Sequence, residues 1–98
     1  MSEGTYIYLI RPRRPRAGFI DSMTAEEAET MDRHFAYLQA LRAENKLVLA
    51  GPCLDGAFGV VILRAASDES ARALMANDPA VRAGIMQADL HQFKISLS

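Results

Sequence analysis

The central stretch of the chain, Lys46–Arg64 (KLVLAGPCLDGAFGVVILR), constrains the fold more than any other part of the sequence. It holds two short apolar runs, Leu47–Ala50 and Phe58–Leu63, which are bounded by Gly, Pro, Asp and charged residues. Runs of this length and composition are typical of β-strands. The Asp55-Gly56 pair between them can supply the positive φ angles of a tight reversal, so the stretch predicts a β-hairpin.

A helical pattern precedes the hairpin. Thr24 and Glu27 have the spacing of a capping box, which predicts that a helix begins at Thr24, and Asn45 is a suitable left-handed terminator. His34 lies at the edge of the predicted apolar stripe, ~50° from its centre at about 100° per residue. There it can be half-buried beside a partner, or it can be a boundary histidine with an ordinary hydrogen bond. The stripe itself consists of Ala28, Met31, Phe35 and Leu38, at three- and four-residue spacing.

A second helical pattern follows the hairpin. Ser67 is a good capping residue, and Asp68 and Glu69 suit the first turn of a helix that ends near Asn77. Asp78 then precedes a proline, which predicts a further short helical turn with Asp78 as its cap. From the residues alone, capping is the role that we expect for Asp78.

Strand patterns lie outside both helices. Thr5–Arg11 is predicted to be a strand, and successive side chains of a strand point to opposite faces. The side chains on both faces are apolar here, so this strand should be covered on both sides. The last strand is predicted over about Ile85–Leu97, where the apolar positions change from even to odd. Such a change of phase indicates a β-bulge near His91-Gln92, or a strand that passes from one packing environment to another.

The order of these elements is βαββαβ, in a single domain over residues 1–98. Two βαβ units with right-handed crossovers give the ferredoxin-like α+β fold, in which two helices cover one face of a four-stranded antiparallel sheet. The other face also carries apolar residues and would form a large exposed patch. We therefore expect a homodimer that packs sheet against sheet.

Composition excludes several classes of function. The net charge of −1 argues against a nucleic-acid binder, and no apolar run is long enough to span a membrane. No signal peptide is predicted, and the single cysteine, Cys53, allows no internal disulfide, so a cytoplasmic setting is expected. Cys53 is interpreted as structural, because nothing near it in sequence would activate it as a nucleophile. No metal-ligand cluster is present, and neither a metal nor an organic cofactor is predicted.

Two further segments are candidates for ligand contact. Residues Arg11–Arg16 (RPRRPR) form either an anion-attracting lip beside a pocket or a solvated loop. Arg11, at the end of the first strand, is the arginine that we expect to face a site. Gly51 followed by Pro52 allows a ligand to approach the backbone closely.

Together these motifs resemble the YCII-related (YciI-like) family of the dimeric α+β barrel superfamily. The features that match, in the same order along the chain, are His34-x-x-Tyr37-Leu38, Leu49-Ala50-Gly51-Pro52, Asp55-Gly56 and Ser67…Ala71 leading to Asp78-Pro79. A related subgroup has proline where this chain has Ala57, which places the sequence nearer the YciI-like branch. The resemblance implies a dimeric barrel and a cleft that contains a histidine and an aspartate, here His34 and Asp78.

The resemblance also implies a function. Relatives include a dehydrochlorinase for a chlorinated hydroxyhydroquinone, and the superfamily includes muconolactone isomerase; neither uses a metal or an organic cofactor. The first hypothesis is thus a small lyase or isomerase in which His34 is the general base and Asp78 orients it, acting on an aromatic or acidic metabolite. Gly51 and Pro52 would shape the pocket, and Arg11 would attract an anionic substrate.

Two other hypotheses remain open at this stage. One is a non-catalytic dimeric module that binds a small molecule or a protein, and the other is a role beside transcription components, which the balanced charge does not favour. A haem or oxygenase function is not indicated, because neither His34 nor His91 has sequence support as a haem ligand.

Overall fold

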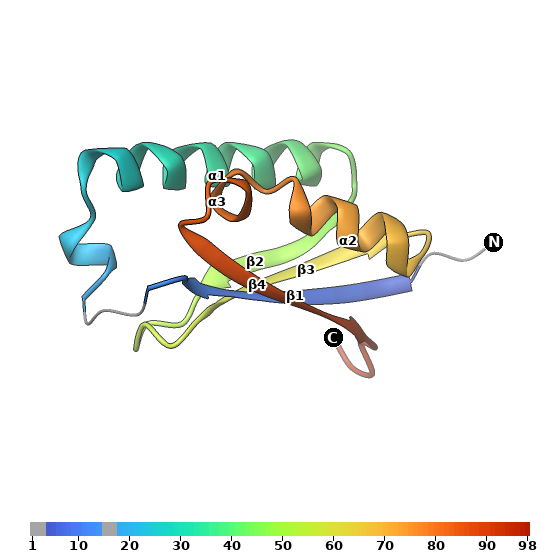
Figure 1. Cartoon of the computed structure of the whole chain (residues 1–98). Helices are drawn as coiled ribbons and strands as arrows, with labels where there is room; N and C mark the ends of the chain where they lie inside the picture. The colour runs from blue at the N-terminus through green and yellow to red at the C-terminus, as the bar shows by residue number, and fades with distance from the viewer. Residues whose placement is uncertain (1–3, 15–17) are drawn as a thin grey trace.

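The computed structural model describes residues 4–14 and 18–98. Its four strands form one antiparallel sheet in the order β2-β3-β1-β4, with the helices on one side of it (Figure 1). This architecture confirms the predicted α+β fold with two main helices on one face of the sheet. The structure also contains two short helical elements. The elements in chain order are β1 (Gly4–Pro12), the 3-10 turn η1 (Ile20–Ser22), α1 (Ala25–Ala43), β2 (Leu47–Pro52), β3 (Gly59–Ala65), α2 (Asp68–Ala76), α3 (Pro79–Arg82) and β4 (Met86–Phe93).

The central hairpin forms as the sequence predicts. The Cys53 amide donates to the Phe58 carbonyl at 2.8 Å and closes the loop between β2 and β3. Gly56 has a φ of 78°, the left-handed conformation that a side chain would strain, and the Asp55 carboxylate accepts from the Ala57 amide at 2.9 Å. The Asp-Gly pair therefore makes the reversal, and Pro52 ends the strand before it.

The predicted helix signals are also confirmed. Thr24 and Glu27 form a reciprocal capping box at the start of α1, and Ser67 caps α2. Asn45 has a φ of 64° just beyond α1, and Gly84 has a φ of 75° after α3. Each helix thus begins and ends at residues whose local chemistry favours an end.

The predicted apolar stripe of α1 is wrong at Phe35, which is 62% exposed. The residues of α1 that are buried are Thr30, His34, Leu38 and Leu41. This face is rotated toward the side of the helix that contacts α3 as well as the sheet. The prediction placed the buried face of α1 wrongly because it considered only apolar side chains. A polar side chain can also be buried when it has a hydrogen-bond partner, as His34 does.

The predicted extent of the last strand is also wrong. β4 ends at Phe93, and its register with β1 is continuous from the Thr5–Phe93 pair to the Pro12–Met86 pair, without a bulge near residues 91–92. The ladder ends at the Thr5–Phe93 pair, one residue from the beginning of β1 at Gly4. The apolar residues at odd positions therefore lie mostly outside the strand, and Leu97 is 94% exposed.

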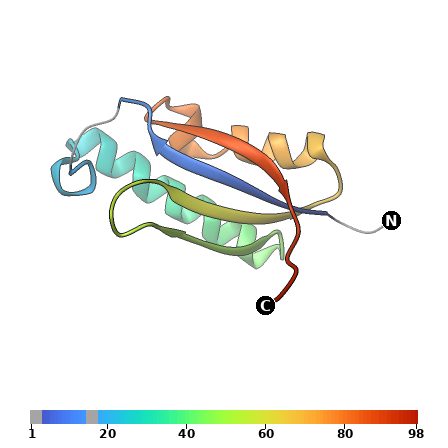
Figure 2. The ribbon, with the colours of Figure 1, turned by 90° about the horizontal axis from the view of Figure 1, so that it is seen from below.

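The two faces of the sheet differ in what covers them. On the face toward the helices, Tyr8, Val61 and Leu63 are buried at the centre of the core, together with Leu38 and Leu41 of α1. Figure 2 shows the opposite face, which no helix covers. Ile7 and Leu9 lie on that open face and are only half-buried in the single chain.

The arginine-rich segment begins inside the sheet, because β1 runs on through Arg11 to Pro12. Residues 15 and 16 of this segment lie outside the described part of the chain. Among the described helices, none is both long enough and apolar enough to cross a membrane.

Candidate active site

His34 lies on the buried face of α1, between the helix layer and the sheet, and is 9% exposed. Its Nδ1 atom is 2.8 Å from Asp78 Oδ1 and 2.8 Å from Asp78 Oδ2. The two residues are 44 positions apart in sequence and meet because α3 packs against α1. The structure therefore brings together the histidine and the aspartate that the sequence singled out.

Asp78 is fully buried, at 0% exposure. Its Oδ1 accepts from the Ala80 amide at 2.9 Å, so it does cap α3 as the residues alone predicted. Its Oδ2 accepts from the Tyr8 hydroxyl at 2.7 Å. Capping and pairing with His34 are thus carried out by one carboxylate, and the two interpretations do not compete.

Three donors surround the buried carboxylate of Asp78. A buried carboxylate is costly unless donors replace the lost water, and here the Tyr8 hydroxyl, the Ala80 amide and the His34 ring all reach it. An ionised carboxylate only accepts hydrogen bonds, so the neutral His34 ring carries its proton on Nδ1. The Nε2 atom is then the one with a free lone pair for proton transfer.

Nε2 also reaches the surface. Within the described residues, no buried side-chain nitrogen or oxygen lacks a hydrogen-bond partner, yet the ring's hydrogen bonds all use Nδ1. An unpartnered Nε2 must therefore touch the solvent-accessible surface. One end of the imidazole is thus fixed by a buried carboxylate, and the His34 side chain as a whole is 11% exposed.

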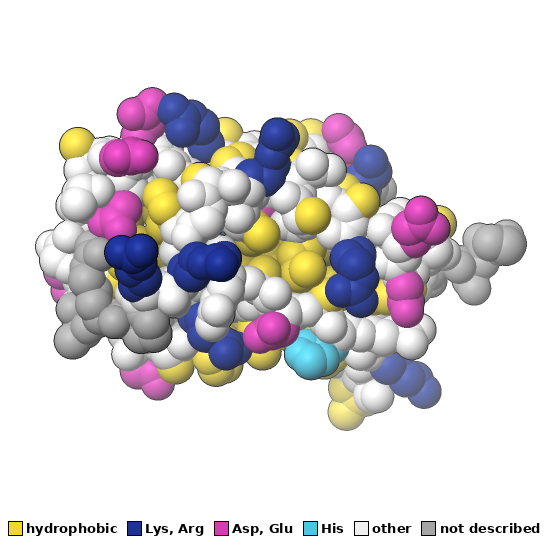
Figure 3. Space-filling model, viewed as in Figure 1, with side chains coloured by type: hydrophobic (Ala, Val, Ile, Leu, Met, Phe, Trp, Pro, Cys, Tyr) yellow, Lys and Arg dark blue, Asp and Glu magenta, His cyan; other side chains and the backbone are white. Residues whose placement is uncertain are grey.

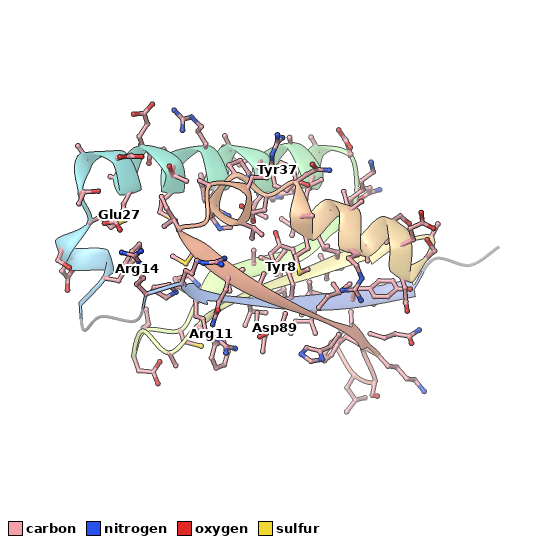
Figure 4. All side chains as sticks on the ribbon, in the orientation of Figure 1. Tyr8, Arg11, Arg14, Glu27, Tyr37 and Asp89 are labelled. Carbon is pink, nitrogen blue, oxygen red and sulfur yellow. The ribbon has the colours of Figure 1, made fainter. Side chains whose placement is uncertain are left out.

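Tyr8 remains a donor at any ordinary pH. Burial, followed by the Asp78 charge and the hydrogen bond to that carboxylate, strongly raises the pKa of Tyr8. Figure 4 shows its side chain on the helix side of the sheet. Sequence reasoning missed this residue, because alternation in the first strand predicted a buried tyrosine but not the partner of its hydroxyl.

Tyr37, the other tyrosine near the pair, has a different partner. Its hydroxyl donates to the Leu74 carbonyl at 2.6 Å and ties α1 to α2. The pKa of Tyr37 is raised, first by burial and second by the Asp78 charge. This contact gives Tyr37 a structural role between the two helices.

The other three predicted site residues do not meet the pair. Arg11 lies on the open face of the sheet, where its guanidinium is 3.5 Å from Asp89 in a partly exposed ion pair (Figure 4). Gly51 and Pro52 are exposed at the end of β2, an outer strand of the sheet. Their role in binding substrate stays a prediction.

A different pair of arginines borders a hollow on the helix side. Arg13 and Arg14 line an open hollow of about 400 Å³, together with Pro12, Phe19, Glu27, Gly84 and Ile85. The Arg13 amide donates to the Ile85 carbonyl at 2.9 Å, which fixes this segment beside the start of β4. Among the described residues, no ion pair engages Arg13 or Arg14. Figure 3 shows basic side chains on this side of the molecule, with apolar surface between them.

A second hollow, of about 500 Å³, lies at the other end of the sheet. It is lined by Gly4, Thr5 and the end of β4. Neither hollow is lined by His34 or Asp78. No group of three or more potential metal-ligating side chains occurs in the described part of the chain.

An antiparallel sheet with helices on one face, and a buried histidine–aspartate pair between the two layers, defines a ferredoxin-like α+β protein with a candidate proton-transfer site. The chain belongs to the YCII-related domain family, whose family model matches residues 6–94. No curated protein matches the sequence.

The solved structures that share the fold include two related proteins. The first is 5-chloro-2-hydroxyhydroquinone dehydrochlorinase (TftG) from Burkholderia phenoliruptrix AC1100, in complex with 2,5-dihydroxybenzoquinone. It has a TM-score of 0.64 and 23% identity, over 91% of this chain and 93% of that chain. The second is the uncharacterized protein TM1266 from Thermotoga maritima, with a TM-score of 0.52 and 10% identity over 94% of this chain and 99% of that chain. At these identities the likeness establishes the fold alone.

Proposed function

We propose that this protein is a small cofactor-independent enzyme of the lyase or isomerase type, which moves protons on a small aromatic or acidic metabolite. His34 is the general base, and Asp78 holds its ring in the required tautomer. The observation that carries the proposal is the contact of Nδ1 with both oxygens of a fully buried carboxylate, at 2.8 Å. Such a contact leaves Nε2 as the basic atom and stabilises the imidazolium that forms when Nε2 takes a proton.

The chemistry needs no net oxidation or reduction. In a dehydrochlorination, Nε2 takes a proton from the substrate, and the electrons of the broken bond form the new π bond while chloride leaves with its bonding pair. In an isomerisation, the same imidazolium returns the proton to another atom. The solved relative that is a dehydrochlorinase supports this class of reaction, although its identity is too low to carry over its substrate.

The hollow beside Arg13 and Arg14 supports an acidic substrate. Glu27, on its rim, lies seven residues before His34 on the same helix, which is two turns or about 10 Å along one face. Two guanidinium groups that line this hollow attract an anion to the same end of α1, without touching the reacting atoms. We therefore propose that these arginines steer an acidic substrate, a role that the sequence assigned to Arg11.

We further propose that the protein works as a homodimer in the cytoplasm. The open face of the sheet carries half-buried or exposed apolar residues on all four strands, among them Leu9, Leu49 and Phe93. A second copy packed on this face would remove them from water. The free thiol of Cys53 fits a reducing compartment.

A second candidate function is a non-catalytic binding module. The observation that favours it is that neither hollow of the single chain is lined by His34 or Asp78. In this case a small molecule binds, and its affinity does not depend on the basicity of His34.

The test compares the two histidines of the chain. The parent protein, His34→Gln and His91→Gln are assayed with chlorinated hydroxyhydroquinones, for chloride release, and with small acidic lactones, for isomerisation. His91 is exposed on β4 and serves as the matched control. We expect His34→Gln to lose activity at least about 100-fold, while His91→Gln stays within about twofold.

Equal turnover by His34→Gln and the parent would end the enzymatic proposal. Ligand binding without turnover, at an affinity that His34→Gln leaves unchanged, would establish the binding module instead.

A further inference from the structure

We infer that Tyr8 is a positioning residue for the His34–Asp78 pair, because its hydroxyl holds the carboxylate in the orientation that serves His34. Only the kinetic part of this inference rests on the proposed function. The geometric part is tested without any substrate.

The argument begins with the contacts of each oxygen of Asp78. Oδ1 receives the Ala80 amide at 2.9 Å, and Oδ2 receives the Tyr8 hydroxyl at 2.7 Å. His34 Nδ1 lies 2.8 Å from both oxygens. One donor on each oxygen fixes the rotation of the carboxylate. The position of the carboxylate is therefore set by Tyr8 and Ala80 and not by the imidazole, which contacts both oxygens equally.

Tyr8 is well placed to anchor this geometry. It is fully buried in β1, which pairs with β3 on one side and β4 on the other. The carboxylate is therefore linked to the middle of the sheet through Tyr8, to α3 through Ala80 and to α1 through His34. Three segments that are far apart in sequence converge on one acidic group.

Packing alone does not explain the hydroxyl. A phenylalanine would fill nearly the same volume in the core, and a buried hydroxyl is costly without a hydrogen bond. Burial and the Asp78 charge also raise the pKa of Tyr8, which keeps the hydroxyl protonated as a donor. Its role is to donate a hydrogen bond permanently.

Removing this donor has a predictable geometric effect. Without the hydrogen bond to Oδ2, only the Ala80 amide and the His34 ring hold the carboxylate, so it can rotate about its Cβ–Cγ bond. The proton of the neutral His34 ring is then held less firmly on Nδ1. Among the described groups, Tyr37 is the other tyrosine that feels the Asp78 charge, and its hydroxyl is bonded to Leu74 instead.

The experiment compares Tyr8→Phe with Tyr37→Phe, two identical chemical changes near the same carboxylate. The ¹⁵N resonances of the His34 ring are recorded by NMR at a pH where the ring is neutral. We expect the ring proton of Tyr8→Phe to be shared between Nδ1 and Nε2, and that of Tyr37→Phe to stay on Nδ1 as in the parent. A Tyr8→Phe ring whose proton stays on Nδ1 would overturn the inference.

A second measurement uses the parent protein and does not depend on the folding of Tyr8→Phe. The Tyr8 hydroxyl proton, bonded to a buried carboxylate, should give a downfield ¹H resonance that exchanges slowly with water and survives in Tyr37→Phe. Its absence from the parent would contradict the inference directly.

Kinetics then separate this inference from the proposed function. With a substrate in hand, kcat of Tyr8→Phe should fall about tenfold while KM stays within about twofold, because the base is mispositioned but the substrate contacts remain. If the tautomer of His34 changes in Tyr8→Phe but no substrate is turned over, the proposed function fails and the inference stands. If turnover is found but neither the tautomer nor kcat responds, the inference fails alone.

Discussion

The two faces of the sheet carry two different kinds of polar contact. On the helix face, Asp78 is fully buried and receives donors from Tyr8, Ala80 and His34 at 2.7 to 2.9 Å. On the open face, Arg11 and Asp89 form a partly exposed ion pair at 3.5 Å. The first contact lies where water is excluded and its geometry is fixed, whereas the second is screened by solvent and contributes little to stability.

This difference shows that a single chain buries one face of its sheet and leaves the other face partly exposed. The helix face is closed by α1, α2 and α3, and no buried polar side-chain atom of the described residues is left without a partner. The open face leaves Ile7, Leu9 and Val60 half-buried. The proposed proton transfer is therefore assigned to the closed face, and the proposed self-association to the open one.

The largest expected effect comes from breaking the closed face. In Asp78→Asn the side-chain amide donates where the carboxylate accepted, which favours the wrong tautomer of His34. We expect kcat to fall on the order of 10³-fold. Asp89→Asn, the same change on the open face, is the control and should stay within about twofold. Similar losses in the two variants would remove the distinction between the faces.

The next effect concerns association. Leu9→Lys places a charge in the middle of the open face, and we expect the dimer to dissociate at least about 100-fold more readily, measured by sedimentation velocity over a concentration series. Phe35→Lys changes an exposed residue of α1, outside the sheet, and should leave the mass unchanged. A parent protein that sediments as a monomer at micromolar concentration contradicts the role given to the open face.

A smaller effect appears in alkaline stability. Burial raises the pKa of Tyr8 above its ordinary value of 10.0, so the unfolded chain loses this proton at lower pH than the folded one. The stability that this group contributes is present below pH 10 and is lost as the pH rises above it, by up to about 1.4 kcal/mol per pH unit. Urea unfolding between pH 9 and 11 should show a shallower decline for Tyr8→Phe than for the parent. Equal slopes would show that the hydroxyl is not protected in the folded state.

The smallest effect concerns the arginine-lined hollow. In Arg13→Gln/Arg14→Gln, we expect KM for an acidic substrate to rise about threefold at low salt and to approach the parent value at high salt, since steering is screened. Arg11→Gln should leave KM unchanged, because Arg11 lies on the open face and is paired with Asp89. A larger effect at Arg11 than at the other two would return the anion-attracting role to the residue that the sequence favoured.

Much of the fold could be predicted because its signals are local. The capping residues Thr24 and Ser67 and the turn residues Asp55 and Gly56 act on their own neighbours in sequence. The end of β4 is not local, because it depends on where the partner strand β1 begins. Alternation alone therefore extended the last strand past Phe93.

The site could be predicted only in part. The family motifs identified His34 and Asp78, but nothing in the sequence indicated that the Tyr8 hydroxyl also reaches Asp78, since 70 positions separate the two residues. Arg11 and Arg13 are only two residues apart, yet one lies on the open face and the other beside the helix-side hollow. Composition predicts an arginine-rich lip but not which guanidinium lies on which face.

The tautomer of the His34 ring tests the central claim most directly. In a ¹H–¹⁵N long-range correlation spectrum of the parent at a pH where the ring is neutral, the account predicts a protonated Nδ1 and an unprotonated Nε2. It also predicts that Asp78→Asn reverses this pattern. A parent ring that carries its proton on Nε2 would contradict the account, because the atom assigned as the base would then have no free lone pair.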